Sequence, residues 1–220
     1  MYSEKLYRFT EPFNDLYAKA SRINYEYPEP QDSKRIKPLV FIWQPGSDLI
    51  GDFTWPGFDD NIIITERVCD FFYSEKILGF GPAPVEILEN NLKRKKIKYV
   101  NMPYRGSRLF DLWVTTWVHF SIQYSTVDRI QDEDGFYYKV NGIEKNESLW
   151  DSQTMELKKV KISRIPRKGI FVHKNDLHGS NIFGILEFPE WIFCTEKMKR
   201  LIELNSFTNV SFLEMGNLLD

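Results

Sequence analysis

Short apolar runs separated by turn-forming residues recur along the chain and predict a structure built mainly from β-strands. Apolar runs bounded by Pro or Gly are typical of buried strands, and apolar–polar alternation is typical of strands with one buried face. Leu39–Trp43, between two prolines, is of the first kind, and 155–162 is of the second kind. The other predicted strands are 4–10, 61–64, 85–88, 113–120, 127–130, 136–140, 169–172, 182–186, 191–194 and 210–213.

Two short segments have the periodicity of helices. Thr65 follows an apolar run, and its hydroxyl can accept a hydrogen bond from an unpaired amide in the first helical turn. Val68, Phe71 and Phe72 then recur at three- and four-residue spacing, which places them on one helix face. We expect this helix to end near Gly79, and a second helix to span 195–204.

The two predicted helices lie in segments that resemble each other. Residues 62–80 align with 192–210 at a constant spacing, so that Thr65 matches Thr195 and Phe71 matches Leu201. We expect both threonines to be N-caps, and Phe71 and Leu201 to face the sheet. The pattern predicts a strand–helix–strand unit used twice, near 62–88 and 192–216, although two ordinary strand–helix units could match by chance.

These patterns together predict an α+β fold. The expected architecture is one mostly antiparallel sheet with two short helices packed against it, in a single domain that spans 1–220. The chain of 220 residues is 15% aromatic, which is enough to build a sizeable core and excludes a disordered chain.

Charge and cysteine content narrow the classes of function. The formal net charge of −2 excludes a basic nucleic-acid scaffold. No apolar run approaches the roughly 20 residues that span a bilayer, and no apolar signal region is visible in the first residues, so we expect a cytoplasmic protein without membrane contact. Cys69 and Cys194 are too few for a disulfide framework and are expected to be buried, reduced thiols.

One family resemblance adds a functional expectation. Two stretches of the sequence are involved. The first consists of Asp52-Phe53-Thr54-Trp55 followed by 63–67, and the second of Ile182-Phe183 followed by 192–202 and Val210-Ser211-Phe212. This order, over about a third of the chain, resembles bacterial immunity proteins of polymorphic toxin systems, in particular the large immunity family numbered eleven. The resemblance implies a non-catalytic protein that binds and neutralises a cognate toxin in the producing cell, without a cofactor. Some relatives carry paired C-x-x-C zinc motifs, which this sequence lacks, so no metal site is carried over.

Three histidines are the main candidates for catalysis. His173, Asp176 and His178 could ligate a metal, which leaves a small metal-dependent hydrolase as an alternative function. The five-residue spacing of the histidines does not stack them on one helix face, and Asn175 and Gly179 indicate a loop, so surface histidines are the simpler interpretation. His119 lies in an aromatic segment and is expected at the core or at a sheet edge. We therefore expect no catalytic and no metal-binding residues.

Four acidic residues form the candidate binding site. Asp128, Asp132, Glu133 and Asp134 surround an Asp-Gly pair, a strong hairpin signal. Carboxylates on a projecting turn could steer and contact a basic toxin, whereas the alternative is a solvated hairpin. The basic run at 93–96 is expected to be a solvated face without nucleic-acid contact. The same residues could instead belong to a module that binds a protein other than a toxin. The sequence does not determine the oligomeric state.

Overall fold

The chain folds into an α+β structure rich in strands. The structure is a computed structural model and describes residues 2–12, 16–23, 37–57, 61–89, 98–133, 135–146, 150–151, 156–157 and 161–220. Strands account for 45% of the residues and helices for 13%, which makes sheets the main framework. The helices are α1 (Glu66–Ser74), α2 (Glu196–Leu204) and the short 3₁₀ helix η1 (Lys174–Leu177). The strands are β1 (Tyr2–Thr10), β2 (Ala20–Arg22), β3 (Leu39–Trp43), β4 (Phe53–Thr54), β5 (Ile63–Thr65), β6 (Phe80–Leu88), β7 (Leu109–Val114), β8 (Trp117–Val118), β9 (Val127–Asp132), β10 (Gly135–Val140), β11 (Ile143–Asn146), β12 (Trp150–Asp151), β13 (Glu156–Leu157), β14 (Lys161–Arg164), β15 (Ile170–His173), β16 (Ile182–Ile185), β17 (Phe188–Thr195) and β18 (Ser211–Leu219).

Two six-stranded sheets form the body. Their strand orders are β15-β18-β1-β17-β16-β8 and β2-β3-β6-β7-β5-β4. Both sheets are mixed, because β15 is parallel to β18, β8 is parallel to β16, and β3 is parallel to β6. Turn signals and alternation in a sequence report local hairpins, so they did not indicate these parallel pairs between distant strands.

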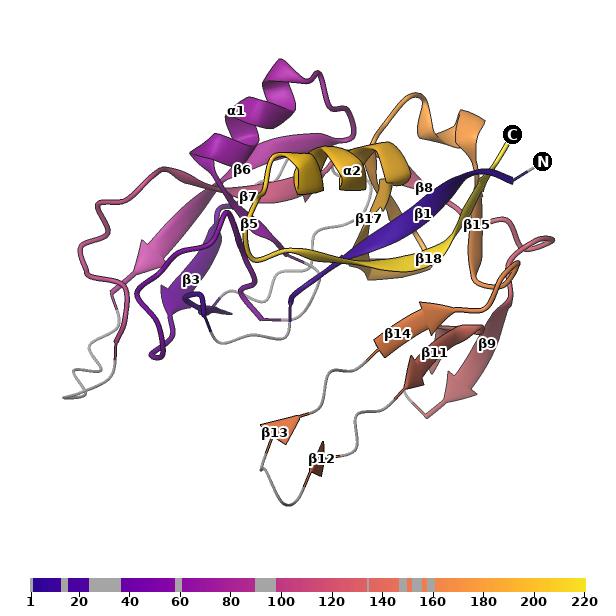
Figure 1. Ribbon diagram of the computed structural model, residues 1–220, viewed down its shortest axis with the longest axis horizontal. Helices are drawn as coiled ribbons and strands as arrows, with labels where there is room; N and C mark the ends of the chain where they lie inside the picture. Colours follow the sequence, from indigo (N-terminus) through magenta and orange to yellow (C-terminus); the bar gives the residue numbers. More distant parts are fainter. Residues whose placement is uncertain are drawn as a thin grey trace.

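Alternate residues of the strands enter different hydrophobic clusters. Ile62 and Ile64 lie in one cluster with the apolar residues of both helices, whereas Ile63 points to the other side of its sheet. Figure 1 shows α1 and α2 side by side above the sheets. We call the cluster beneath the helices the shared core, because it contains residues from both ends of the chain. It includes Phe9, Phe53, Phe72, Ile192, Met198 and Ile202.

The first helix ends earlier than the sequence predicted. It ends at Ser74 rather than near Gly79, and β6 begins at Phe80, so the predicted strand at 85–88 is only the second half of β6. Pro82 and Pro84 belong to the first half, which pairs with β7, whereas the pairs with β3 begin at Val85. Prolines are tolerated where a strand has one neighbour, since alternate residues there donate no ladder hydrogen bond.

Three further strand predictions were also imprecise. The predicted strand at 113–120 is divided between β7 and β8. The alternating segment 155–162 lies partly outside the described residues, and its described parts belong to β13 and β14. The last strand extends to Leu219 instead of ending at residue 213, because it pairs with β1 along its whole length.

The two helices begin and end with nearly the same backbone geometry. Thr65 has φ −74° and ψ 160°, and Thr195 has φ −74° and ψ 161°. After each helix one residue adopts a left-handed conformation, Lys76 with φ 54° and Ser206 with φ 51°. The sequence similarity of the two segments is therefore accompanied by the same local backbone path.

The capping hydrogen bonds differ between the helices. Thr195 accepts a hydrogen bond from the Met198 amide at 3.3 Å, as expected for an N-cap. Thr65 occupies the N-cap position, but its hydroxyl makes no capping bond and instead donates to Asp52 at 3.4 Å. The prediction of two hydroxyl caps was therefore wrong for Thr65, whose hydroxyl is directed toward buried Asp52 instead of the amides of the first helical turn. Phe71 and Leu201 are half-buried and pack against the shared core, as expected.

Asp52 also joins the two segments. Its carboxylate accepts hydrogen bonds from the Thr208 amide at 2.9 Å and the Thr208 hydroxyl at 3.0 Å, and it forms an ion pair with Arg67 at 2.8 Å. The guanidinium of Arg67 donates to the Asn205 carbonyl at 3.0 Å. The start of α1 is thus bonded to the loop that follows α2.

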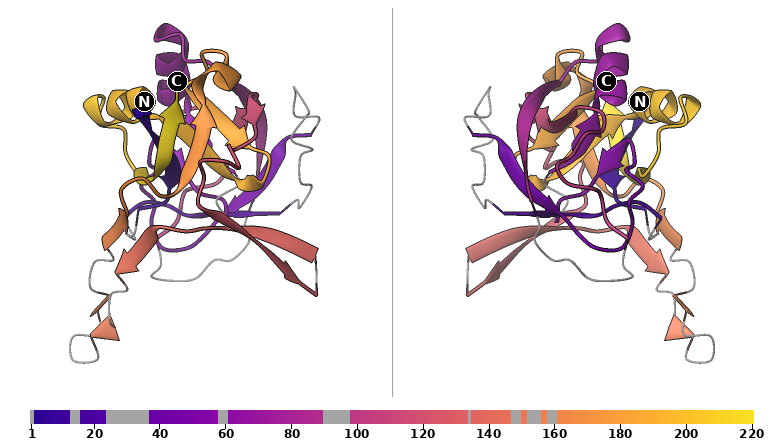
Figure 2. Two further views of the ribbon diagram at one scale, coloured as in Figure 1. Left: turned by 90° about the vertical axis from the view of Figure 1, so that its right-hand side faces the viewer. Right: turned by 90° about the vertical axis from the view of Figure 1, so that its left-hand side faces the viewer.

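The segment between β8 and β15 projects from this body. Figures 1 and 2 show β9 to β14 extending away from the side opposite the two helices. Within the described residues, neither helix has the length and apolar character needed to cross a bilayer.

We predict unequal effects of the two threonines on stability. Thr195→Ala should lower the free energy of unfolding by about 1 kcal/mol, because it removes a capping bond. Thr65→Ala should cost clearly less, because only a long bond to Asp52 is lost. Urea denaturation of both variants measures the difference, and equal losses would contradict the assignment of the cap to Thr195 alone.

Candidate functional site

The acidic candidate residues lie on the β9–β10 hairpin. The two strands pair antiparallel from Val127↔Val140 to Asp132↔Gly135, which agrees with the predicted Asp-Gly hairpin. Gly135 has φ 137°, a conformation that favours glycine and allows the chain to reverse. The hairpin is thus a regular two-stranded ribbon at the edge of the body.

The hairpin separates the acidic residues along its length. Glu133 is exposed at the turn, whereas Asp128 lies near the base and is paired across the ladder with Lys139. Four residues of strand place Asp128 about 13 Å from Asp132. Asp134 and the side chain of Asp132 lie outside the described part of the chain. The acidic candidates therefore do not form one compact cluster, and Asp128 faces a basic neighbour.

Aromatic packing attaches the hairpin to the body. The ring of Tyr138 lies 5.7 Å from Phe120 and 6.1 Å from Phe188. Val127 and Val140, at the open end of the hairpin, pack against the same hydrophobic cluster. These contacts fix the orientation of the ribbon, so its outer part projects in a defined direction.

Two aromatic side chains are exposed on the outer part of the hairpin. Phe136 is 56% exposed and Tyr137 is 50% exposed. The guanidinium of Arg129 lies 3.7 Å from the Phe136 ring centroid, a cation–π contact that orders both side chains. Alternation along the strand places Phe136 on the face of Tyr138 but beyond the body. The sequence contains these two aromatic residues, but it does not indicate that the body of the protein leaves their side chains uncovered.

The histidine candidates do not form a metal site. His173 ends β15, residues 174–177 form η1, and His178 adopts a left-handed conformation with φ 48°. The two histidines and Asp176 are exposed, and His173 packs edge-on to Tyr124 at 6.3 Å. No three His, Cys, Asp or Glu residues of the described chain are grouped so as to hold a metal ion.

Two further polar side chains, those of His119 and Ser180, have structural partners. His119 lies at the sheet edge, one of its two expected places, because it directly follows the edge strand β8; its side chain is exposed, and its Nδ1 lies 2.7 Å from Glu187. The hydroxyl of Ser180 shares a hydrogen bond with Thr116 at 2.8 Å. Neither contact brings a nucleophile to a base, which nucleophilic catalysis requires.

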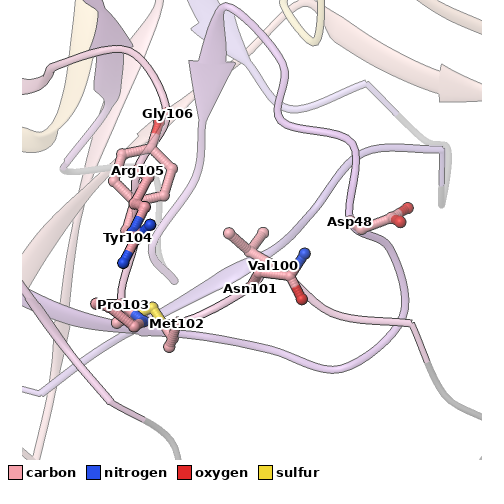
Figure 3. Close-up of a pocket in the computed structure, with 8 residues that line it drawn as sticks. All are labelled: Asp48, Val100, Asn101, Met102, Pro103, Tyr104, Arg105 and Gly106. Carbon is pink, nitrogen blue, oxygen red and sulfur yellow. The ribbon is translucent and has the colours of Figure 1, made fainter.

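One open pocket lies beside β3. Figure 3 shows its lining, which consists of Asp48 and the loop 100–106. Asp48 forms a long ion pair with Lys98 at 3.9 Å, and the hydroxyl of Tyr104 donates to the Ser107 carbonyl at 2.8 Å. Burial raises the pKa of Tyr104, so its phenol stays neutral.

Both cysteines are free and buried, as predicted. Burial raises the pKa of the Cys69 thiol to about 11, and nearby Asp70 adds to the effect. Burial also raises the pKa of Cys194 well above its usual value. Because the thiolate is the reactive form, both side chains are inert parts of the core.

Comparison with protein families and with curated proteins identifies no relative of this chain. No protein-family model matches the chain, and no curated protein matches it.

We predict that the native thiols resist modification. At about pH 8 both should stay protonated and be labelled by a thiol reagent only as the chain unfolds in urea. Lys139→Cys, at an exposed position of the hairpin, provides a control thiol that should react at once. Rapid labelling of Cys69 or Cys194 in the native wild-type protein would contradict their burial.

Proposed function

We propose that this protein is a non-catalytic immunity protein, which binds a cognate bacterial toxin in the cytoplasm of the producing cell and thereby neutralises it. The observation that supports this proposal most directly is the projecting β9–β10 hairpin, with exposed Phe136 and Tyr137 next to an acidic turn. The resemblance of the segments around Thr65 and Thr195 to immunity proteins supports the biological role.

The chemistry of the hairpin suits a protein partner with a basic surface. Phe and Tyr bury large areas at low cost in side-chain entropy, and aromatic residues are enriched at protein interfaces. Exposed Glu133 places a negative charge beside these aromatic residues, and charges at the rim of an interface mainly accelerate association. Tyr138 holds the ribbon in place before binding, which lowers the entropy cost of forming the complex.

We also infer that the chain arose by duplication of a largely antiparallel strand–helix–strand unit. The matching backbone paths at Thr65 and Thr195, and at Lys76 and Ser206, support this inference. The projecting segment from β9 to β14 has no counterpart among the described residues of the first half. Insertions on one face of a repeated framework often carry binding, which favours the hairpin as the recognition element.

The proposal predicts a toxin gene beside the gene for this protein, and the test uses the toxin domain that this gene encodes. The double variant Phe136→Ala/Tyr137→Ala should weaken toxin affinity by about 2 kcal/mol or more, because anchor residues are lost. The triple variant Asp132→Ala/Glu133→Ala/Asp134→Ala should mainly slow association and flatten its salt dependence. Kinetic binding measurements at several salt concentrations separate the two effects.

Leu204→Ala is the matched control. Leu204 is 80% exposed on α2, on the other side of the molecule, so its truncation removes exposed apolar surface without touching the hairpin. Wild-type affinity is expected for this variant. If both hairpin variants also bind with unchanged affinity and salt dependence, the toxin interface lies elsewhere.

A further inference from the structure

Each six-stranded sheet has its own central strand, and the strands beside it are arranged in the same way in both sheets. β1 lies between β17 and β18, and β7 lies between β5 and β6, with all four pairings antiparallel. A parallel strand follows on one side, β15 beside β18 and β3 beside β6. An antiparallel strand follows on the other side, β16 beside β17 and β4 beside β5. The strand order and directions therefore correspond across most of each sheet.

The pairing register corresponds as well. Arg8 of β1 is paired with Phe193 and Leu213. Asp111 of β7 is paired with Ile63 and Ala83. Phe193 and Ile63 both lie two residues before the threonine that begins the helix, and Leu213 and Ala83 lie at matching distances after it. Arg8 and Asp111 thus hold equivalent positions, which makes β1 the counterpart of β7.

Each half of the chain gives its first strand to the sheet of the other half. The first half runs from β1 to β6, yet β1 lies in the sheet made by β15 to β18. The second half begins with β7, which lies in the sheet made by β3 to β6. This reciprocal arrangement is that of a dimer whose subunits exchange a terminal strand, here joined into one chain.

We propose that the slot between β17 and β18 is an interaction surface for β1 of a second copy of this chain, so that two copies form a strand-exchanged dimer. The slot already accepts a strand from the opposite end of the chain. β1 is the first strand of the described chain, and Tyr2 is paired with Leu219, so the first and last described strands lie side by side (Figure 1). Within the described chain, β1 is joined to the other elements only at its Thr10 end, so it can leave the slot without passing through a described loop.

The slot recognises β1 through specific side chains. Tyr7 and Phe9 enter the shared core, and Leu6 enters the cluster on the opposite face of the sheet. Lys5 forms an ion pair with Glu214 at 2.7 Å, and the guanidinium of Arg8 lies 4.2 Å from the centroid of the Trp191 ring.

The matching slot in the other sheet selects a different strand. There Asp111 is fully buried at the place that corresponds to Arg8. The two occupying strands thus differ in side-chain chemistry at this position, Arg8 in β1 and buried Asp111 in β7, so β1 matches the slot between β17 and β18 and does not reproduce the occupant of the slot between β5 and β6.

Exchange preserves the contacts of the closed monomer. The same ladder and core form in both states, so they differ mainly in the entropy of association and in the connection from Thr10 to Ala20, which has no described helix or strand. The proportion of dimer should therefore rise with the concentration at which the chains refold.

The experiment uses a cross-strand pair that reports which chain supplies β1. Thr10 and Ser211 are directly paired, and their hydroxyl oxygens lie 2.8 Å apart. One full-length chain carries Thr10→Cys, and a second full-length chain with a mass tag carries Ser211→Cys. Neither can form this disulfide within itself, so a covalent heterodimer requires β1 of one copy against β18 of the other.

Co-refolding of the two chains under oxidising conditions should yield a covalent heterodimer, and its fraction should increase as the protein concentration is raised. Mixing the chains after each has folded alone should yield none. The double variant Thr10→Cys/Ser211→Cys, refolded in dilute solution, should form the disulfide within one chain and so verify the pair. Lys139→Cys replaces Thr10→Cys as the matched control and should not crosslink to Ser211→Cys.

Absence of the heterodimer after concentrated co-refolding would overturn the proposal. So would equal crosslinking of the separately folded chains or of the Lys139→Cys control, since both would show random surface contact. Failure of the double variant to form its disulfide would remove the register on which the proposal depends. These outcomes are independent of toxin binding.

Discussion

Backbone pairing of β1 with both β17 and β18 is the constraint on which the rest of the structure depends. A central strand satisfies the hydrogen-bonding groups of both neighbours, so its removal would leave two unpaired edges inside a sheet. β1 also places Phe9 in the shared core and Leu6 in the cluster on the other face. The start and the end of the chain therefore stabilise each other, and neither sheet is complete without residues from both halves.

The contacts around Asp52 join the two halves of the chain, and three glycines allow segments that are distant in the chain to approach closely. Asp52 lies outside the helices and strands, yet its carboxylate bonds to Thr208 and Arg67. It thereby links the segments that contain α1 and α2. Gly169 and Gly216 allow β15 and β18 to approach closely, since a Cβ at either position would collide with the backbone of the other strand. Gly79 likewise leaves room for the backbone of Ile182. Close approach between segments distant in the chain is thus provided by a few positions without side chains.

A rigid body with one attached ribbon is an arrangement suited to recognition. The hydrophobic clusters bury most of the apolar side chains of the sheets and helices, whereas the hairpin is anchored by Tyr138 and exposes Phe136 and Tyr137 at its outer part. Binding residues on a projecting element can vary in sequence while the framework stays the same. This separation agrees with the proposed immunity role, in which closely similar frameworks would meet different toxins.

The sequence by itself determined the local elements of this protein: two Thr-started helices with one apolar face, the Asp-Gly hairpin, buried thiols and the similarity of the two helix segments. These follow from periodicity, turn chemistry and side-chain polarity, which act between near neighbours. Tertiary structure alone decided the parallel pairs, the place of β1 in the sheet of the other half, and the loss of the Thr65 cap to Asp52. It also separated Asp128 from the acidic turn and exposed Phe136 beyond the body. These features depend on contacts between residues far apart in the chain, whose spatial proximity no local pattern encodes.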